Sequence, residues 1–144
     1  MLRIPRIIDQ LVLQTIAMPR HTNSNGDMFG GWIISQMDLG AAVIAQTVAR
    51  GRVATVAIDK VTLTNPIAVG DIVSCRGTLV HVGKTSMGIK MVCTAQRGAE
   101  SKQVTEGTFT FVAISETGRP RPIPADSEAG GVKTVAKADL RELE

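Results

Sequence analysis

Aromatic residues are scarce in this chain: they make up 3% of its 144 residues, and tyrosine is absent. A hydrophobic core must therefore be built from aliphatic and small side chains, which the 44% of hydrophobic residues can supply. A chain of this length is typical of one compact domain, and the sequence contains neither an internal repeat nor a sign of a second domain.

Cysteine is also rare, and only Cys75 and Cys93 occur. Two cysteines do not form the disulfide framework of a small secreted protein. Both lie in strand-like runs, "DIVSCRGTLVHV" and "SMGIKMVCTAQR". We therefore predict that both are small buried side chains.

Long hydrophobic runs and strong charge are missing as well. No stretch approaches the ~18 uninterrupted apolar residues of a membrane span, and the start "MLRIPRIIDQ" lacks the apolar core of a secretory signal. A formal net charge of +3 is too small and too evenly spread to indicate a nucleic-acid partner, but it suits a protein that handles a small anionic ligand. We expect a soluble, cytoplasmic protein without a membrane partner.

The chain begins with a strand-like alternation and then changes to a helical period. Residues 10–19 predict a strand that ends at Pro19, and the turn-rich "RHTNSNGD" follows it. From about residue 30 to residue 50 the sequence contains no proline and is apolar nearly all round, which predicts a long helix wrapped by other structure. Arg50 falls in its last predicted turn, and Gly51 is the predicted stop.

Strand-like runs make up the rest of the core, and they cover residues 52–65, 72–83, 85–97 and 103–115. The short segments between them, such as "NPIAVGD" and "GAESK", favour antiparallel hairpins. The order of one strand, a long helix and four strands predicts an α+β fold over residues 1–125, in which a curved antiparallel sheet wraps one long central helix. The tail, residues 126–144, is predicted as either a short docked helix or a mobile tail.

Several motifs resemble those of one enzyme family. They are "MP" before "TNSNGDMFGGW", "SQMD" within the predicted helix, "PIAVGD", "VGKTS" and "GRPRPIP". In this combination they resemble the acyl-CoA thioesterases of the hotdog superfamily over roughly residues 10–124, and most closely the YciA-type bacterial acyl-CoA hydrolases. The hotdog fold of that family is the wrapped-helix architecture that the element order predicts.

The resemblance implies an activity and an assembly. It implies hydrolysis of acyl-CoA thioesters to free acid and CoA without a metal or organic cofactor, so coenzyme A enters only as part of substrate and product. It also implies homodimers whose two sheets join and whose active sites lie at the interface. Since YciA-type members are typically trimers of such dimers, a homohexamer is expected.

Asp38 is an isolated carboxylate in the apolar helical segment, where burial without a partner is costly. The small residues that share its face by helical spacing are Ser35, Ala41, Ala42 and Ala45. They predict a face cleared for a ligand or for a closely packed neighbour. Asp38 is a candidate general base, or a nucleophile that forms a mixed anhydride, and the resemblance places the catalytic acidic residue here. The alternative is an aspartate that caps or pairs within a subunit interface.

The predicted helix starts at Gly30 and Gly31, where a substrate carbonyl can approach unpaired backbone N–H groups. Gly31 lies ~10 Å from Asp38 along the helix axis, at ~1.5 Å per residue. Asp38 therefore acts through water, or the amides and the carboxylate of one site come from different subunits. The resemblance brings Asn23 to the carboxylate from a partner domain or subunit, although an ordinary turn residue is the alternative. Asp27 is a candidate helix cap.

Coenzyme A carries several phosphates, so its site needs cations and amide donors. The candidate substrate-binding residues are Gly30, Gly83, Lys84, Thr85, Ser86, Arg119 and Arg121. For each cation the alternative is a solvated surface charge.

Three other functions compete with a thioesterase. One is a non-catalytic acyl-CoA-binding module, against which the presence of both Asn23 and Asp38 argues. Another is a hotdog dehydratase or hydratase, which needs a histidine; His21 precedes the loop asparagine, and Phe29 stands where many related enzymes carry histidine in "HGG". The last is a thioesterase that takes acyl-carrier protein instead of CoA. Trp32 is interpreted as a core residue.

Overall fold

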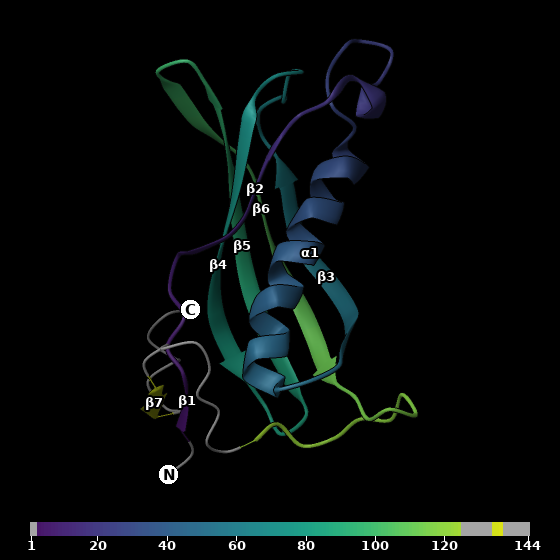
Figure 1. Ribbon diagram of the computed structural model, residues 1–144, viewed down its shortest axis with the longest axis vertical. Coiled ribbons are helices and arrows are strands. Elements are labelled where there is room, and N and C mark those ends of the chain that lie inside the picture. The colour runs from purple at the N-terminus through teal and green to yellow at the C-terminus, as the bar shows by residue number, and fades with distance from the viewer. Residues whose placement is uncertain (1–2, 125–133, 137–144) are drawn as a thin grey trace.

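The computed structural model describes residues 3–124 and 134–136. A five-stranded antiparallel sheet curves around one long helix that runs along its strands (Figure 1). The helix and the five strands of this sheet are β2 (Gln10–Ile16), α1 (Gly30–Ala49), β3 (Val53–Leu63), β4 (Ile72–Val82), β5 (Ser86–Arg97) and β6 (Glu100–Ala113). This is the wrapped-helix architecture that the sequence predicts.

Short elements complete the described chain. A 3-10 turn, Pro19–His21, follows β2. The strands β1 (Arg3–Pro5) and β7 (Thr134–Ala136) pair with each other in a separate two-stranded sheet. Of the tail expected from residue 126 on, these three residues of β7 are described, and the rest of that prediction lies outside the described residues. No helix among the described residues is long and apolar enough to cross a membrane.

The hydrophobic core lies between α1 and the inner face of the sheet. Its largest fully buried side chains include Phe109, Phe111, Met37, Met87 and Met91, so flexible methionines take space that aromatic residues do not fill. Cys75 and Cys93 are buried and free, as predicted. They face each other across β4 and β5, and contact with the Cys75 thiol together with burial raises the pKa of Cys93.

The hairpin prediction is wrong for the connection from β3 to β4. The sheet order is β2-β4-β5-β6-β3, so these consecutive strands lie at different places in the sheet: β3 forms one edge, and β4 pairs with β2 near the other. Residues 64–71 therefore cross the end of the sheet. They contact the loop before α1, where Asp27 and Ala68 form an isolated antiparallel bridge.

The helix is not wrapped on all sides within one chain. Leu39 is 58% exposed and Val43 is 48% exposed, and their i, i+4 spacing places them on one face of α1. The edge strand β3 also exposes large apolar side chains, among them Val56, Ile58 and Leu63. Five strands cover only one side of a helix, so the described residues leave the open face of α1 and the edge of β3 uncovered.

The ends of α1 differ slightly from the prediction. The helix begins at Gly30, but its N-cap is Phe29 and carries no side-chain cap hydrogen bond, so the prediction of Asp27 as a cap is wrong. At the other end α1 stops at Ala49, one residue early. Arg50 adopts a left-handed conformation there (φ 53°), and its backbone N–H donates to the Gln46 carbonyl.

Candidate active site

Asp38 lies in the middle of α1 on the boundary between its buried and open faces, and its side chain is half-buried. The hydroxyl of Thr55 on β3 donates a hydrogen bond to Asp38 Oδ1 over 2.8 Å. Within the described residues the second carboxylate oxygen has no hydrogen-bond donor. Asp38 is therefore held by one oxygen and has the other available to a water molecule or a substrate.

Thr55 is a site residue that the sequence does not reveal. It is one of several threonines in strand-like runs, and its spacing along the chain gives no sign that it faces the helix. Only the packing of β3 against α1 brings its hydroxyl to Asp38.

The face predicted to be cleared around Asp38 is only partly open. Ala41 and Ala45 have no exposed surface, because they point into the core against the sheet. Ala42 is half-buried, and Ser35 is exposed, with its hydroxyl donating to the Gly31 carbonyl over 2.9 Å. The small residues therefore serve close helix–sheet packing on one side of Asp38, and open space remains only on the other.

Asn23 is anchored by its side-chain oxygen. Asn23 Oδ1 accepts hydrogen bonds from the backbone N–H groups of Asn25 (2.9 Å) and Asp27 (3.1 Å). The backbone N–H of Asn23 donates to the Asp27 carbonyl over 2.7 Å. Because the oxygen is occupied twice, the Nδ2 group is the end left to act as a donor. Among the described residues it has no acceptor.

A hollow of about 230 Å³ lies beside Asn23 at the start of α1. Its walls include Gly30 together with the apolar side chains of Ile33, Leu63 and Ile67. A Cβ atom on Gly30 would lie 2.9 Å from Leu63 Cδ1, so the absence of a side chain at Gly30 allows β3 to approach the helix. A Cβ on Gly31 would meet nothing within 4 Å. Gly31 is therefore the open position of the pair, and Gly30 is the packed one.

Trp32 and His21 form a second surface at the helix start. Their rings stack with centroids 6.1 Å apart, and Arg20 Nε donates to His21 Nε2 over 3.1 Å. Trp32 packs against the core but remains half-buried, so it is only in part the core residue that the sequence predicts. Together with Phe29 these residues line a shallow hollow of about 370 Å³ that also reaches Gly31.

Apart from Gly30, which begins α1, the predicted CoA-binding residues gather at the opposite end of the molecule, next to the C-terminal end of α1. The β4–β5 turn is held by the N–H of Gly83, which donates to the Ser86 carbonyl over 2.7 Å. The N–H of Ile123 donates to the Lys84 carbonyl and the N–H of Ala113 to the Thr85 carbonyl, both over 2.8 Å. These bonds bring residues 119–123 alongside the turn.

Of the two candidate arginines, Arg121 is already engaged with its own chain. Its Nε donates to the Ile114 carbonyl over 3.0 Å, and its guanidinium occupies the space that a side chain on Gly51 would fill. Arg119 is exposed, as is Lys84. Within the described residues, the charged groups of Lys84 and Arg119 make no hydrogen bond or ion pair, so both are available to a ligand.

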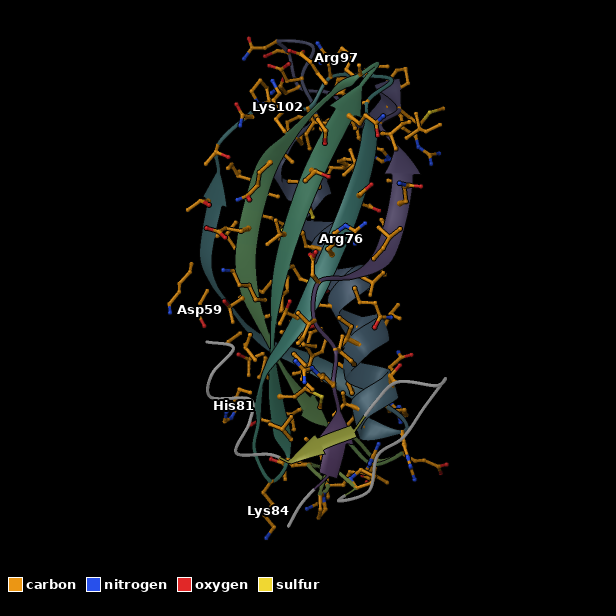
Figure 2. All side chains as sticks on the ribbon, turned by 90° about the vertical axis from the view of Figure 1, so that its left-hand side faces the viewer. Asp59, Arg76, His81, Lys84, Arg97 and Lys102 are labelled. Carbon is orange, nitrogen blue, oxygen red and sulfur yellow. The ribbon has the colours of Figure 1, made fainter. Side chains whose placement is uncertain are left out.

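Within one chain, the predicted site residues thus lie at three separate positions along α1. Asn23, Gly30 and Gly31 lie at its start, and Asp38 lies near its middle. The basic end, which we define as Gly83–Ser86 with Arg119 and Arg121, lies near its C-terminus. Figure 2 shows Lys84 at one end of the sheet, with Arg97 and Lys102 at the other. A 20-residue helix is roughly 30 Å long, so one chain does not bring these groups together. Among the described residues no cluster of three His, Cys, Asp or Glu side chains could hold a metal ion.

A curved antiparallel sheet wrapped around a single long helix is the hotdog fold. The family model of the Thioesterase superfamily matches residues 25–101. The chain belongs to that superfamily.

Similar proteins include bacterial acyl-CoA thioester hydrolases. An uncharacterized acyl-CoA thioester hydrolase of Haemophilus influenzae is 45% identical over 131 residues, 88% of this chain and 85% of that protein. The acyl-CoA thioester hydrolase YciA of Escherichia coli K12 is 43% identical over 121 residues, 81% of this chain and 92% of that protein.

Two of the similar solved structures are hexamers. HI0827, a hexameric broad-specificity acyl-coenzyme A thioesterase, is 47% identical with a TM-score of 0.77, covering 81% of this chain and 82% of that one. Cj0915, a hexameric hotdog-fold thioesterase of Campylobacter jejuni, is 34% identical with a TM-score of 0.77, covering 93% of this chain and 95% of that one.

Proposed function

We infer that this protein hydrolyses acyl-CoA thioesters to a free carboxylic acid and CoA. The observation that carries the inference is the Asp38 carboxylate, oriented by Thr55 on the open side of a helix whose N-terminus presents Gly31 and Asn23. Relatives that are 43–45% identical carry the name acyl-CoA thioester hydrolase, which supports the same activity.

Thioester hydrolysis needs a polarised carbonyl, an attacking nucleophile and a departing thiolate. The backbone N–H groups at the start of α1 and the Asn23 Nδ2 group supply donors for the negative charge that develops on the carbonyl oxygen. The free oxygen of Asp38 takes a proton from water as the water attacks the carbonyl carbon, or attacks that carbon itself. The protein groups thus supply the polarisation of the carbonyl and the activation of the nucleophile, and CoA leaves as the thiol after protonation.

The two roles of Asp38 differ in where oxygen from water ends. If water attacks, the new oxygen goes to the fatty acid in a single turnover. If Asp38 attacks, a mixed anhydride forms, and its hydrolysis at the aspartyl carbonyl places oxygen from water in the Asp38 carboxylate. Single turnover in oxygen-18 water followed by mass spectrometry of the Asp38 peptide tests the covalent route, because label in the Asp38 carboxylate arises only when the anhydride is hydrolysed at the aspartyl carbonyl.

The working unit is a homodimer joined through β3. Within the part of the chain that the structure describes, no strand pairs with the outer edge of β3, and unpaired edges of this kind are sites for adding a strand. A two-fold axis that pairs two β3 strands antiparallel also reverses one helix relative to the other. The basic end of one subunit then lies toward the α1 start of its partner, and Asn23 of one subunit serves Asp38 of the other.

A trimer of such dimers is the assembly that we propose for the whole protein. Its support is the hexameric state given for HI0827 and Cj0915. The exposed apolar residues on α1, Leu39 and Val43, are available to contacts beyond a single chain.

Thr55→Val should lower kcat by about 10- to 100-fold with little change in KM, because a hydrogen bond to a charged group is worth ~1.5–3 kcal/mol and Asp38 would lose its orienting donor. Thr62→Val is the matched control, since Thr62 is also exposed on β3. Steady-state kinetics on both variants measures the effect. Equal kcat values for the two variants would show that the Thr55 hydroxyl does not act on the reaction.

Lys84→Gln should raise KM for acyl-CoA by about two- to fivefold, as expected for an exposed charge contact worth ~0.5–1 kcal/mol. The reason is that Lys84, in the basic end, is proposed to meet a CoA phosphate. The matched substrate is the same acyl group on pantetheine, which has no nucleotide, and its KM should not change. An equal rise in KM for both substrates would show that Lys84 does not recognise a CoA phosphate.

The activity itself is tested with a panel of acyl-CoA lengths in the presence of a thiol reagent. Release of free CoA supports the hydrolase, whereas tight binding without release would indicate a non-catalytic acyl-CoA-binding module. Reversible hydration of an enoyl-CoA without thiol release would indicate a dehydratase or hydratase. Faster hydrolysis of acyl groups carried by acyl-carrier protein than of any acyl-CoA would identify the acyl-carrier-protein thioester as the substrate.

A further inference from the structure

A buried carboxylate lies outside the groups used above. Asp71 follows the β3–β4 connection and is only 2% exposed, yet it is ionised against Arg97, whose side chain is 64% exposed. Arg97 Nε donates to Asp71 Oδ1 over 2.8 Å, and Arg97 Nη2 donates to Oδ2 over 3.2 Å. The hydrogen bond from Arg97 lowers the pKa of Asp71 and outweighs the opposing effect of burial.

Asp71 fixes the turn that precedes it. The N–H of Ala68 donates to Asp71 Oδ2 over 3.0 Å, and the N–H of Asp71 donates back to the Ala68 carbonyl over 3.1 Å. Gly70 has φ +93°, a conformation that favours glycine and closes the turn. The Asp71 carbonyl accepts from the N–H of Ala17 over 3.0 Å, so the end of β2 is tied to the same turn.

The same turn also holds the loop that carries Asn23. Ala68 forms an isolated bridge with Asp27, and the N–H of Met28 donates to the Ile67 carbonyl over 2.9 Å. Asp27 is the residue whose N–H and carbonyl both bond to Asn23. The negative charge of Asp27 also raises the pKa of Arg97, although less than Asp71 does. The Arg97 guanidinium therefore interacts with both the β3–β4 turn and the loop before α1.

We propose that the Asp71–Arg97 pair is a clamp that positions the Asn23 amide for the reaction. The path runs from Arg97 through Asp71, Ala68 and Asp27 to Asn23, with a hydrogen bond or an isolated β-bridge at each step. Asp71 and Arg97 are positioning residues, because neither touches the reacting atoms. The inference rests on the proposed role of Asn23, and a small displacement of a catalytic group is enough to slow an enzyme.

Arg97→Gln tests the clamp against Asn23→Ala. Arg97→Gln should lower kcat about 10-fold with KM within twofold, and Arg97→Lys should recover part of the loss. Adding Arg97→Gln to Asn23→Ala should lower kcat no further, because the clamp acts through Asn23. Lys90→Gln is the matched control: it removes the cation of the exposed Lys90–Glu106 pair, 3.6 Å apart, and should leave kcat unchanged.

Hydrogen exchange gives a reading that does not depend on activity. In Arg97→Gln the amides of residues 22–29 should exchange faster than in the wild-type protein, while the strands of the sheet keep their protection. If Arg97→Gln leaves too little folded protein, the neutral pair Asp71→Asn with Arg97→Gln replaces it, because no unpaired charge then stays buried.

The outcomes separate the two hypotheses. If Asn23→Ala leaves kcat unchanged, the proposed role of Asn23 fails and the clamp fails with it. If Asn23→Ala lowers kcat but Arg97→Gln does not, the clamp alone is overturned. The clamp is also overturned if both variants lower kcat and the double variant shows the product of the two losses. Unchanged exchange of residues 22–29 in Arg97→Gln overturns it as well.

Discussion

Asp38→Asn should lower kcat for acyl-CoA hydrolysis by about 100- to 10 000-fold, the range expected when a general base is removed. Asparagine has nearly the same shape and can still accept the Thr55 hydrogen bond, so the helix and its packing are kept. It can neither take a proton from water nor form an anhydride, so both mechanisms for Asp38 lose the step that it performs. KM should change little, since neither mechanism uses the carboxylate to hold CoA.

Asp9→Asn is the matched control for this substitution. Asp9 is an exposed carboxylate between β1 and β2, away from the β3 edge through which the proposed dimer is joined. The variant should keep wild-type kcat within about twofold, as for a surface change away from the site. If Asp38→Asn turns over acyl-CoA within a few-fold of wild type, Asp38 is not the catalytic carboxylate.

Ile58→Lys should separate the subunits and remove nearly all activity without touching the predicted catalytic groups. Ile58 is 42% exposed on the edge strand β3, so one chain tolerates a lysine there. In the β3-paired dimer the same position is covered, and an unpaired ammonium would be buried at the interface. Because the proposed site takes Asp38 and Asn23 from different subunits, separated chains are expected to be folded and inactive.

Ile8→Lys is the control, since Ile8 is also 42% exposed but lies before β2, away from the β3 edge. Light scattering after size-exclusion chromatography gives the mass, and the hydrolysis assay gives kcat. Ile8→Lys should keep both the oligomer and the activity. An Ile58→Lys protein that is monomeric and fully active would show that one chain contains the whole site.

The sequence predicts the main elements because they depend on local patterns. The proline-free apolar segment gives α1 to within one residue, and the run predicted over residues 72–83 gives β4, Ile72–Val82, also to within one residue. The "GAESK" segment is less accurate: only Gly98 and Ala99 form the turn, with Gly98 at φ +61°, and β6 starts at Glu100. Two residues suffice to reverse the chain, so the flanking polar residues are free to extend the strands.

The long-range arrangement is not in these patterns. No local pattern indicates that β3 pairs with β6 instead of β4, or that Ala41 and Ala45 are fully buried while Ala42 is only half-buried. Thr55 and the Asp71–Arg97 pair are likewise defined by contacts between residues 17 and 26 positions apart in the sequence. Asp38 itself could be singled out, because a lone carboxylate in an apolar helix is conspicuous without any knowledge of its neighbours.

The predicted CoA residues illustrate the same distinction. Motifs identify Gly83–Ser86, Arg119 and Arg121, and the structure brings them together at one end of α1. Their distance from Gly31 along the helix becomes visible only in three dimensions.

Subunit complementation tests the shared site most directly. Asp38→Asn and Asn23→Ala chains, each nearly inactive alone, are co-expressed with different tags. If the site is shared, a mixed dimer contains one intact site and one doubly altered site, so random pairing should restore about a quarter of wild-type kcat per site. Activity should follow the doubly tagged fraction. If the mixed dimers are isolated and remain as inactive as the parents, each chain uses its own Asp38 and Asn23, and the shared site is contradicted.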